Sequence, residues 1–263
     1  GTTVRQVTRN LKAYRIGDAA KDIYDFTWRE LCDWYLEMAK PRLYAGPDAP
    51  GAQAVRFTIH RVFSTVLRLL HPFMPFLSEE LWHALPGTEG DVCVAEWPVP
   101  ARAANKEIEA NMELLKEIVG AVRNLRSEMN IPPARKASVL IRTQGPEGDL
   151  IRGQADLIAL LSKAEPLEAG PSLRKPTVSA STVVRSHEIF LPLEGLIDVE
   201  TERKRLEKEL DKVLRDFDQS MRKLQNEDFL GKARKDVVDR ERTRLESLGV
   251  TKEKLERNLE VLR

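Results

Sequence analysis

The sequence predicts a mainly α-helical protein, built from a helical bundle, a small α+β module and a C-terminal antiparallel coiled-coil hairpin. Three observations support this fold class. Apolar residues recur at helical spacing through the first half of the chain. The spacing becomes that of short strands near residue 137, and the final stretch carries narrow apolar seams on highly charged helices. We expect three domains, at residues 1–134, 135–196 and 197–263.

The first domain is expected to be a bundle because its helical segments are joined by short links and have apolar residues on one side. Pro41 should stop the first helical stretch, since proline cannot donate a backbone hydrogen bond. Ser78 is a natural N-cap for a short helix that begins with acidic residues. Pro132 and Pro133 follow the last helix. The expected helices cover about residues 4–40, 53–70, 79–84 and 105–129.

The second domain changes period. We expect one strand, then a helix, then two paired strands, at residues 137–142, 150–161, 177–184 and 188–193.

The third domain shows the clearest pattern. Leu206, Val213 and Leu224 belong to one apolar seam, and Val238 and Leu245 belong to a second seam after a break at residues 226–231. Two such helices can bury their seams against each other as an antiparallel hairpin, with arms of roughly 40 Å. Around Leu248-Gly249-Val250 we expect the return helix to bend or break.

The composition limits the possible functions. Lys and Arg total 42 and Asp and Glu total 41, a net charge of +1, so nucleic-acid binding would need local basic patches. Cys32 and Cys93 lack partners at disulfide or metal-ligand spacing, which favours a reducing, cytoplasmic location. No apolar run is long enough to span a membrane. The chain starts without methionine, and we expect it to be part of a longer protein.

Candidate catalytic residues are scarce. No glycine-rich phosphate loop is present, and His60, His71, His83 and His187 are scattered without suitable partners, so we interpret them as structural or surface residues. The thiol of Cys32, inside an aromatic-rich segment, is interpreted as a small buried hydrophobe. We predict no catalytic site, cofactor or metal in this chain.

Basic clusters are more informative. Arginine and lysine side chains gathered at helix ends or on one helix face can bind RNA phosphates, although they can also serve as a solvated face or complement a helix C-terminus. The cluster around the hairpin turn suggests that a basic tip meets a polyanion, although solubility alone would also explain it. The candidate RNA-binding residues are Lys40, Arg42, Arg123, Arg126, Arg135, Lys136, Arg222, Lys223, Lys232, Arg234 and Lys235.

Several motifs resemble one family. The segment 25–37, followed by Lys40-Pro41, resembles the start of the anticodon-binding domain of valyl-tRNA synthetases. Segment 71–76, His-Pro-Phe-Met-Pro-Phe, is similar to a motif shared by the valyl, isoleucyl and leucyl enzymes. Segments 123–133 and 191–198 resemble the valyl type, and residues 226–237 resemble the tip of that family's C-terminal arm. Asp228 and Arg234 depart from the pattern expected at this tip.

The resemblance implies a division of labour in tRNA recognition. The bundle would read splayed anticodon bases and the arm would brace the outer corner of the tRNA, with no DNA or membrane partner. The parent, expected to be monomeric, would use ATP and Mg²⁺ to attach valine. Its ATP-binding signatures and editing domain are missing from this sequence. Two alternatives are the equivalent part of an isoleucyl or leucyl enzyme, which the hairpin argues against, and a coiled-coil scaffold for protein partners.

Overall fold

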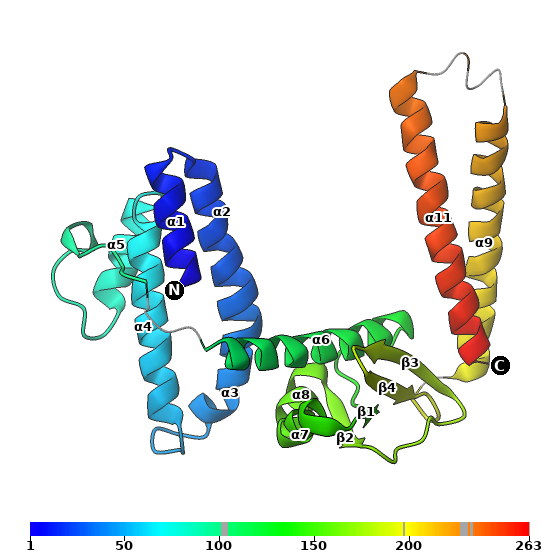
Figure 1. The fold of residues 1–263 in the computed structure, drawn as a ribbon, viewed down its shortest axis with the longest axis horizontal. Helices are drawn as coiled ribbons and strands as arrows, with labels where there is room; N and C mark the ends of the chain where they lie inside the picture. The colour runs from blue at the N-terminus through cyan, green and yellow to red at the C-terminus, as the bar shows by residue number, and fades with distance from the viewer. Residues whose placement is uncertain (101–104, 197, 227–230, 232–233, 263) are drawn as a thin grey trace. The chain divides into compact units, whose positions relative to one another are not determined.

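The computed structural model describes residues 1–100, 105–196, 198–226, 231 and 234–262. The chain divides into two compact units, Gly1–Glu109 and Ala110–Arg263. Most of the structure is helical, as predicted, and a four-stranded sheet lies in the second unit (Figure 1). The boundary expected after residue 134 falls inside this second unit. Within the part of the chain that is described, no helix has the length and apolar character needed to cross a membrane.

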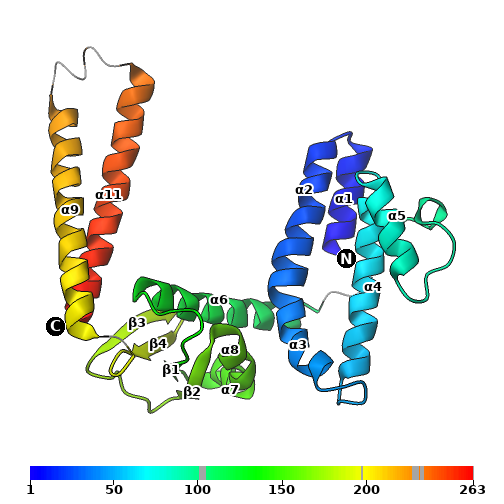
Figure 2. The same ribbon diagram turned by 180° about the vertical axis from the view of Figure 1, so that it is seen from behind.

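The first unit is a bundle whose helices α1, α2 and α4 lie side by side (Figures 1 and 2). Its core forms where the apolar faces of these helices meet, around Val7, Ile23 and Leu69. Burial of such side chains stabilises the bundle by about 1.5–3 kcal/mol each. The elements are α1 (Thr2–Lys12), α2 (Ile16–Asp25), the π-helix η1 (Phe26–Leu36), α3 (Glu37–Tyr44), α4 (Ala52–Leu70), α5 (Pro75–Ala84) and the 3₁₀ helix η2 (Val92–Val94).

Two expected helix ends in this unit were wrong. Pro41 lies inside α3, which continues to Tyr44. The helix loses one backbone donor there, yet the carbonyl of Pro41 still accepts a hydrogen bond from Ala45 N at 3.1 Å. Ser78 is not an N-cap, because α5 starts earlier, with Pro75 in its first turn, where a missing N–H costs little. The Ser78 hydroxyl is buried and lies 2.8 Å from Nδ1 of His71.

The second unit begins at Ala110, inside the long helix α6 (Lys106–Glu128). The side chain of Asn105 caps it by accepting hydrogen bonds from the backbone N–H groups of Glu107 and Ile108. Its buried face belongs with the sheet module rather than the bundle, and polar contacts to Leu161 and Lys163 tie it there. This packing explains why the compact units divide near the start of α6. The buried face contains Leu114, Leu115, Ile118, Val119, Val122 and Leu125.

The sheet has the strand order β2-β1-β4-β3. Strands β1 and β2 are parallel and are joined through two short helices, whereas β4 runs antiparallel to both β1 and β3. The alternation in β1 buries Val139 and Ile141, and the central strand β4 buries Ile189, Phe190 and Leu191. The elements are β1 (Ala137–Arg142), α7 (Gly145–Gly153), α8 (Ala155–Ser162), β2 (Ala164–Gly170), β3 (Ser179–Val184) and β4 (His187–Pro192).

The predictions for β1, β3 and β4 are confirmed, but two details of this module were wrong. The single helix expected at 150–161 is two helices that meet at Gln154. Strand β2 was missed, because it is an edge strand with largely exposed side chains and a proline, Pro166.

The predicted hairpin is confirmed. Helices α9 (Val199–Gln225) and α11 (Lys235–Val261) lie side by side along their length (Figures 1 and 2). Leu206 and Leu255 are buried between them, and the Ser220 hydroxyl donates to a carboxylate oxygen of Glu241 at 2.7 Å. The interruption expected near Gly249 was wrong, since α11 runs through it without a break.

Candidate nucleic-acid interface

The two basic candidates of α3 differ in their availability. Lys40 is half-buried and forms an ion pair with Glu37 one turn earlier, and this hydrogen bond raises the pKa of Lys40. Arg42 is exposed at the end of the helix, and its side-chain stem lies against Gly51, where an added Cβ would meet the Arg42 Cδ at 3.5 Å. Arg42 is therefore the more accessible cation at this end of the first unit.

Exposed aromatic rings are a feature of the first unit that the sequence analysis did not predict. Tyr24 and Trp28 are 62% and 58% exposed, and their rings stack at a centroid distance of 6.5 Å and an interplanar angle of 9°. An exposed flat surface of this kind suits stacking with an unpaired base. All exposed aromatic residues among those described lie in this unit: Tyr14, Tyr24, Trp28, Tyr44, Phe57, Phe76 and Trp97.

The π-helix η1 follows directly after α2, so the stack spans the change from α-helix to π-helix. Such segments are rare and frequently occur at functional sites. The stacked pair is flanked by Asp25, which forms ion pairs with Lys21 and Arg29. Hydrogen bonding from Lys21 is the main cause that lowers the pKa of Asp25. These pairs place two cationic side chains next to the exposed rings.

Arg123 and Arg126 in α6 differ in exposure: Arg123 is exposed, whereas Arg126 is buried, contrary to our expectation for Arg126. The Arg123 guanidinium donates twice to the Leu161 carbonyl, at 3.0 and 2.8 Å. Arg126 is only 5% exposed and donates to the carbonyl oxygens of Lys163, Pro132 and Arg135. Burial lowers the pKa of Arg126. Both side chains close the ends of neighbouring segments, so Arg126 is unavailable to an RNA phosphate.

The pair Arg135 and Lys136 is also involved in contacts within the module. Arg135 donates to the carbonyl of Gly195 at 2.8 Å, and the Lys136 ammonium lies 2.5 Å from a carboxylate oxygen of Glu165. Both side chains remain exposed to solvent. Exposed ion pairs of this type contribute little free energy, so they can exchange for a phosphate at small cost.

The basic tip of the hairpin remains accessible. Arg222 and Lys235 are exposed and form no ion pair within the described ranges. Lys223 is half-buried and lies 3.9 Å from Glu241, while the largely exposed Arg234 pairs with Asp236 at 3.0 Å. The remaining tip candidate, Lys232, lies outside the described residues, as does Asp228.

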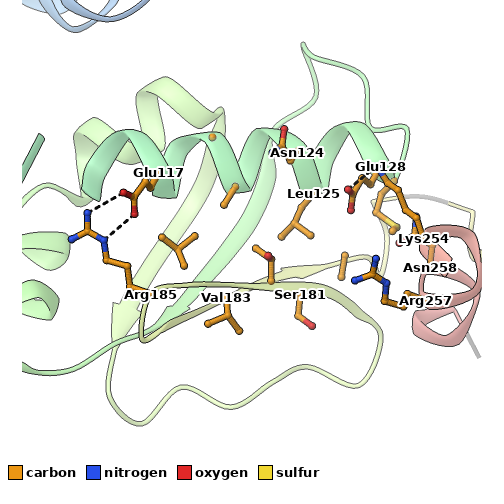
Figure 3. A pocket seen from close by; sticks show the side chains of 16 residues that line it. Glu117, Asn124, Leu125, Glu128, Ser181, Val183, Arg185, Lys254, Arg257 and Asn258 are labelled. Carbon is orange, nitrogen blue, oxygen red and sulfur yellow. Dashed lines mark hydrogen bonds and ion pairs between the residues drawn. The ribbon is translucent and has the colours of Figure 1, made fainter. Parts of the chain in front are cut away.

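A cleft of about 600 Å³ lies at the base of the hairpin, between α6, β3 and α11 (Figure 3). The Lys254 ammonium contacts a carboxylate oxygen of Glu128 at 2.9 Å and so ties the hairpin to α6. On the opposite side, Arg185 forms paired hydrogen bonds with Glu117 at 2.9 and 3.0 Å. These bonds lower the pKa of Glu117 and raise that of Arg185. This cleft could not be predicted from the sequence, since its walls are far apart along the chain.

One group of side chains in the second unit has the order of a hydrolase triad but not its accessibility. Thr143 Oγ1 lies 2.7 Å from Nδ1 of His187, and the His187 Nε2 lies 3.0 Å from a Glu147 oxygen. Thr143 and His187 are buried, at 2% and 1% exposure, so no substrate can reach the hydroxyl. The group joins β1, β4 and α7 and has a structural role, which agrees with our interpretation of His187.

Two known protein families match this chain. The family described as "Anticodon-binding domain of tRNA ligase" matches residues 1–141, and the family "Valyl tRNA synthetase tRNA binding arm" matches residues 198–263. The first match extends through α6 to β1, beyond the boundary of the compact unit. The second match covers the hairpin, which supports the valyl type over the isoleucyl and leucyl alternatives.

Several curated relatives of this chain are named valine–tRNA ligase. The chain is 40% identical to a "Valine--tRNA ligase" of Carboxydothermus hydrogenoformans over 98% of its own length and 29% of the relative. It is 39% identical to that of Geobacter sulfurreducens over 96% of the chain and 29% of the relative. It is 40% identical to that of Geobacillus stearothermophilus over 91% of the chain and 27% of the relative.

The chain thus spans less than a third of the length of the curated relatives it matches, and the matched families cover its bundle and its hairpin. The chain belongs to the valyl-tRNA synthetase family, of which it contains the anticodon-binding domain and the tRNA-binding arm.

Proposed function

We propose that this chain is the tRNA-recognition region of a valine–tRNA ligase and that it binds tRNA through two separate surfaces. The first unit receives unpaired bases of the anticodon loop, and the tip of the hairpin contacts the phosphate backbone at the outer corner. The parent enzyme, a cytoplasmic monomer, uses ATP and Mg²⁺ elsewhere in its chain to attach valine. The chain described here contributes binding and orientation of the tRNA.

The observation that carries this proposal is the exposed stack of Tyr24 and Trp28 in the first unit. Leaving a large ring such as Trp28 in water forgoes about 1.5–3 kcal/mol of burial. Stacking on a splayed base recovers a comparable amount, about 1–3 kcal/mol for each base. The rings of Tyr24 and Trp28 are already nearly parallel, so a base can stack on them without rearrangement of the two side chains. Arg42, exposed on the same run of helices, supplies charge for the adjoining phosphates.

The hairpin supports the second contact through its charge pattern. Along the shaft, basic and acidic residues are interspersed, and some are paired within one helix, as for Arg205 with Glu202 and Glu209. At the tip, basic residues gather on both sides of the turn, and Arg222 and Lys235 are exposed without an ion pair among the described residues. A neutral shaft with a basic end attracts RNA at the end alone, which is the property expected of a brace that binds phosphates without reading sequence.

The test is a salt titration of tRNA binding by fluorescence anisotropy, with valine tRNA and an anticodon-altered tRNA. We expect the Trp28→Ala substitution to weaken binding of valine tRNA by about 1–3 kcal/mol and to reduce the discrimination between the two tRNAs. Phe76→Ala is the matched control, because Phe76 is 91% exposed but has no stacking partner in the described part of the chain.

The arm is tested in the same assay with Arg222→Ser and Lys235→Ser combined. The slope of log affinity against log salt should become shallower by about 0.7–0.9 for each phosphate contact removed, with anticodon preference unchanged. Lys208→Ser, an exposed cation of the shaft, is the control. A tRNA affinity that does not change with salt concentration, with the anticodon or with either set of substitutions would contradict the proposal and favour the alternative of a protein-interaction scaffold.

A further inference from the structure

A histidine and two carboxylates lie close together in the first unit, on α5 and the loop that follows it. Nε2 of His83 lies 3.2 Å from Oε1 of Glu79 and 3.2 Å from Oδ1 of Asp91. One ligand atom from each of the three residues lies within 4.8 Å of the other two. Within the described part of the chain, neither carboxylate has a lysine or arginine partner, so the cluster has unbalanced negative charge when His83 is neutral.

Helix α5 and the loop after it hold the three side chains in place. Glu79 and His83 are four residues apart in α5 and therefore lie on the same face. The loop returns to this face because the indole N–H of Trp82 donates to the carbonyl of Gly90 at 3.2 Å. The backbone N–H of Val92 donates to Oε1 of Glu79 at 2.8 Å. Asp91, between these two anchor points, is thus positioned by the fold.

The spacing of these atoms fits a metal ion. Zn²⁺ binds histidine nitrogen and carboxylate oxygen at about 2.0–2.2 Å in tetrahedral sites, so neighbouring ligand atoms lie roughly 3.3–3.5 Å apart. The two distances from the His83 nitrogen are close to this tetrahedral edge. The hydrogen bond from Val92 to Glu79 is of the kind that orients metal-binding carboxylates.

We propose that Glu79, His83 and Asp91 form a binding site for a divalent transition-metal ion of the Zn²⁺ type. Three protein ligands leave a fourth position for water, as in open zinc sites. Bound metal would cross-link α5 to the loop that leads into η2 and would neutralise the carboxylates. This inference is independent of tRNA binding and departs from the sequence analysis, which predicted no metal. Asp91 could not be assigned there, since only the fold of the loop brings it to α5.

The competing explanation is an imidazolium bridge, in which protonated His83 donates to one or both carboxylates. It accounts for the same distances without a metal. The two explanations differ in what the site does when Zn²⁺ is added at a pH where free histidine is neutral. The metal site binds the ion with defined stoichiometry, whereas the bridge does not.

Isothermal titration of the 263-residue chain with ZnCl₂ at pH 7.5 distinguishes them. The reference protein is Cys93→Ser, because Cys93 is an exposed thiol two residues after Asp91, and an exposed thiol is itself able to bind Zn²⁺. We expect one ion per chain. In that background, His83→Gln and Asp91→Asn should each weaken Zn²⁺ binding by at least about tenfold. Even mutation of a residue that only hydrogen-bonds a metal ligand typically lowers metal affinity by about 10- to 100-fold. His60→Gln is the matched control, as its Nε2 contacts the Pro86 carbonyl instead.

A second measurement guards against misfolding. The amide resonance of Val92 in a ¹H–¹⁵N spectrum should shift on Zn²⁺ addition, because this N–H is bonded to Glu79. The His83 side chain is 54% exposed, so its replacement by glutamine should leave the remaining spectrum unchanged. Absence of saturable binding, or equal weakening by His60→Gln and His83→Gln, would overturn the proposal and leave the imidazolium bridge.

Discussion

Replacing Arg126 with methionine separates a structural arginine from an RNA-binding one. Its guanidinium donates to the carbonyl oxygens of Lys163, Pro132 and Arg135. Two of these oxygens also accept a backbone hydrogen bond: that of Lys163 from Ala137 N at 3.4 Å, and that of Pro132 from Arg135 N at 3.0 Å. Only the Arg135 carbonyl would be left without a donor within the described residues. Hydrogen bonds from a charged group contribute about 1.5–3 kcal/mol each to stability. Methionine should recover part of this loss, because its apolar side chain is buried at the same position. We expect the free energy of unfolding to fall by about 2–4 kcal/mol.

Urea unfolding with two probes locates this loss. All four tryptophans, Trp28, Trp34, Trp82 and Trp97, lie in the first unit, so their fluorescence follows the bundle. Far-ultraviolet circular dichroism follows the helices of both units. The Arg126→Met substitution should shift the circular dichroism transition while the fluorescence transition moves little. Arg222→Met, at an exposed position, should change stability by less than about 0.5 kcal/mol.

The same variant tests the RNA assignment. At a temperature where Arg126→Met is folded, we expect its affinity for tRNA to equal that of the wild type. An unchanged urea transition, combined with weakened tRNA binding, would refute the structural assignment and return Arg126 to the interface.

Two further predictions concern the second unit. In α11, Gly249→Ala should stabilise the hairpin by about 0.5–1 kcal/mol in thermal unfolding, because glycine destabilises the interior of a helix relative to alanine. The added methyl group fits, since it would lie 3.6 Å from Phe217, an ordinary contact. Destabilisation would show that the helix is not continuous there. In the module, hydrogen bonding by Arg185 holds the pKa values of Glu117 and Glu147 below their ordinary value of 4.5. This contribution is present above about pH 4.5 and lost as pH falls through the lowered pKa values. Arg185→Gln should therefore be less stable than the wild type at pH 6, with the difference shrinking towards pH 3; a difference that stays constant with pH would contradict this assignment.

Much of the fold could be predicted because apolar periodicity reports burial directly. Helix α4 begins one residue before the expected position, and the seams of α9 and α11 correctly paired two distant segments. Local rules failed where tertiary contacts outweighed them. Pro41 is tolerated because helical turns on both sides are otherwise bonded, and Gly249 is supported by the neighbouring helix. The edge strand β2 has too little buried surface to produce a strand pattern.

The candidate site was harder to predict, because charge alone does not show where a side chain points. Arg123 and Arg126 share a helix face, as expected, but that face meets the carbonyl ends of other segments. Conversely, Tyr24 and Trp28 are large aromatic residues of the kind that is usually highly buried, yet both are exposed. Burial, rather than residue type, distinguishes a binding side chain from a structural one.

Hydroxyl-radical footprinting of valine tRNA tests most directly whether two separate surfaces grip the RNA. With the wild-type chain we expect protection in the anticodon loop and, as a distinct patch, at the outer corner. Trp28→Ala should remove the first protection alone, and combined Arg222→Ser and Lys235→Ser should remove the second alone. Loss of both patches together in either variant, or of neither in both, would contradict the account.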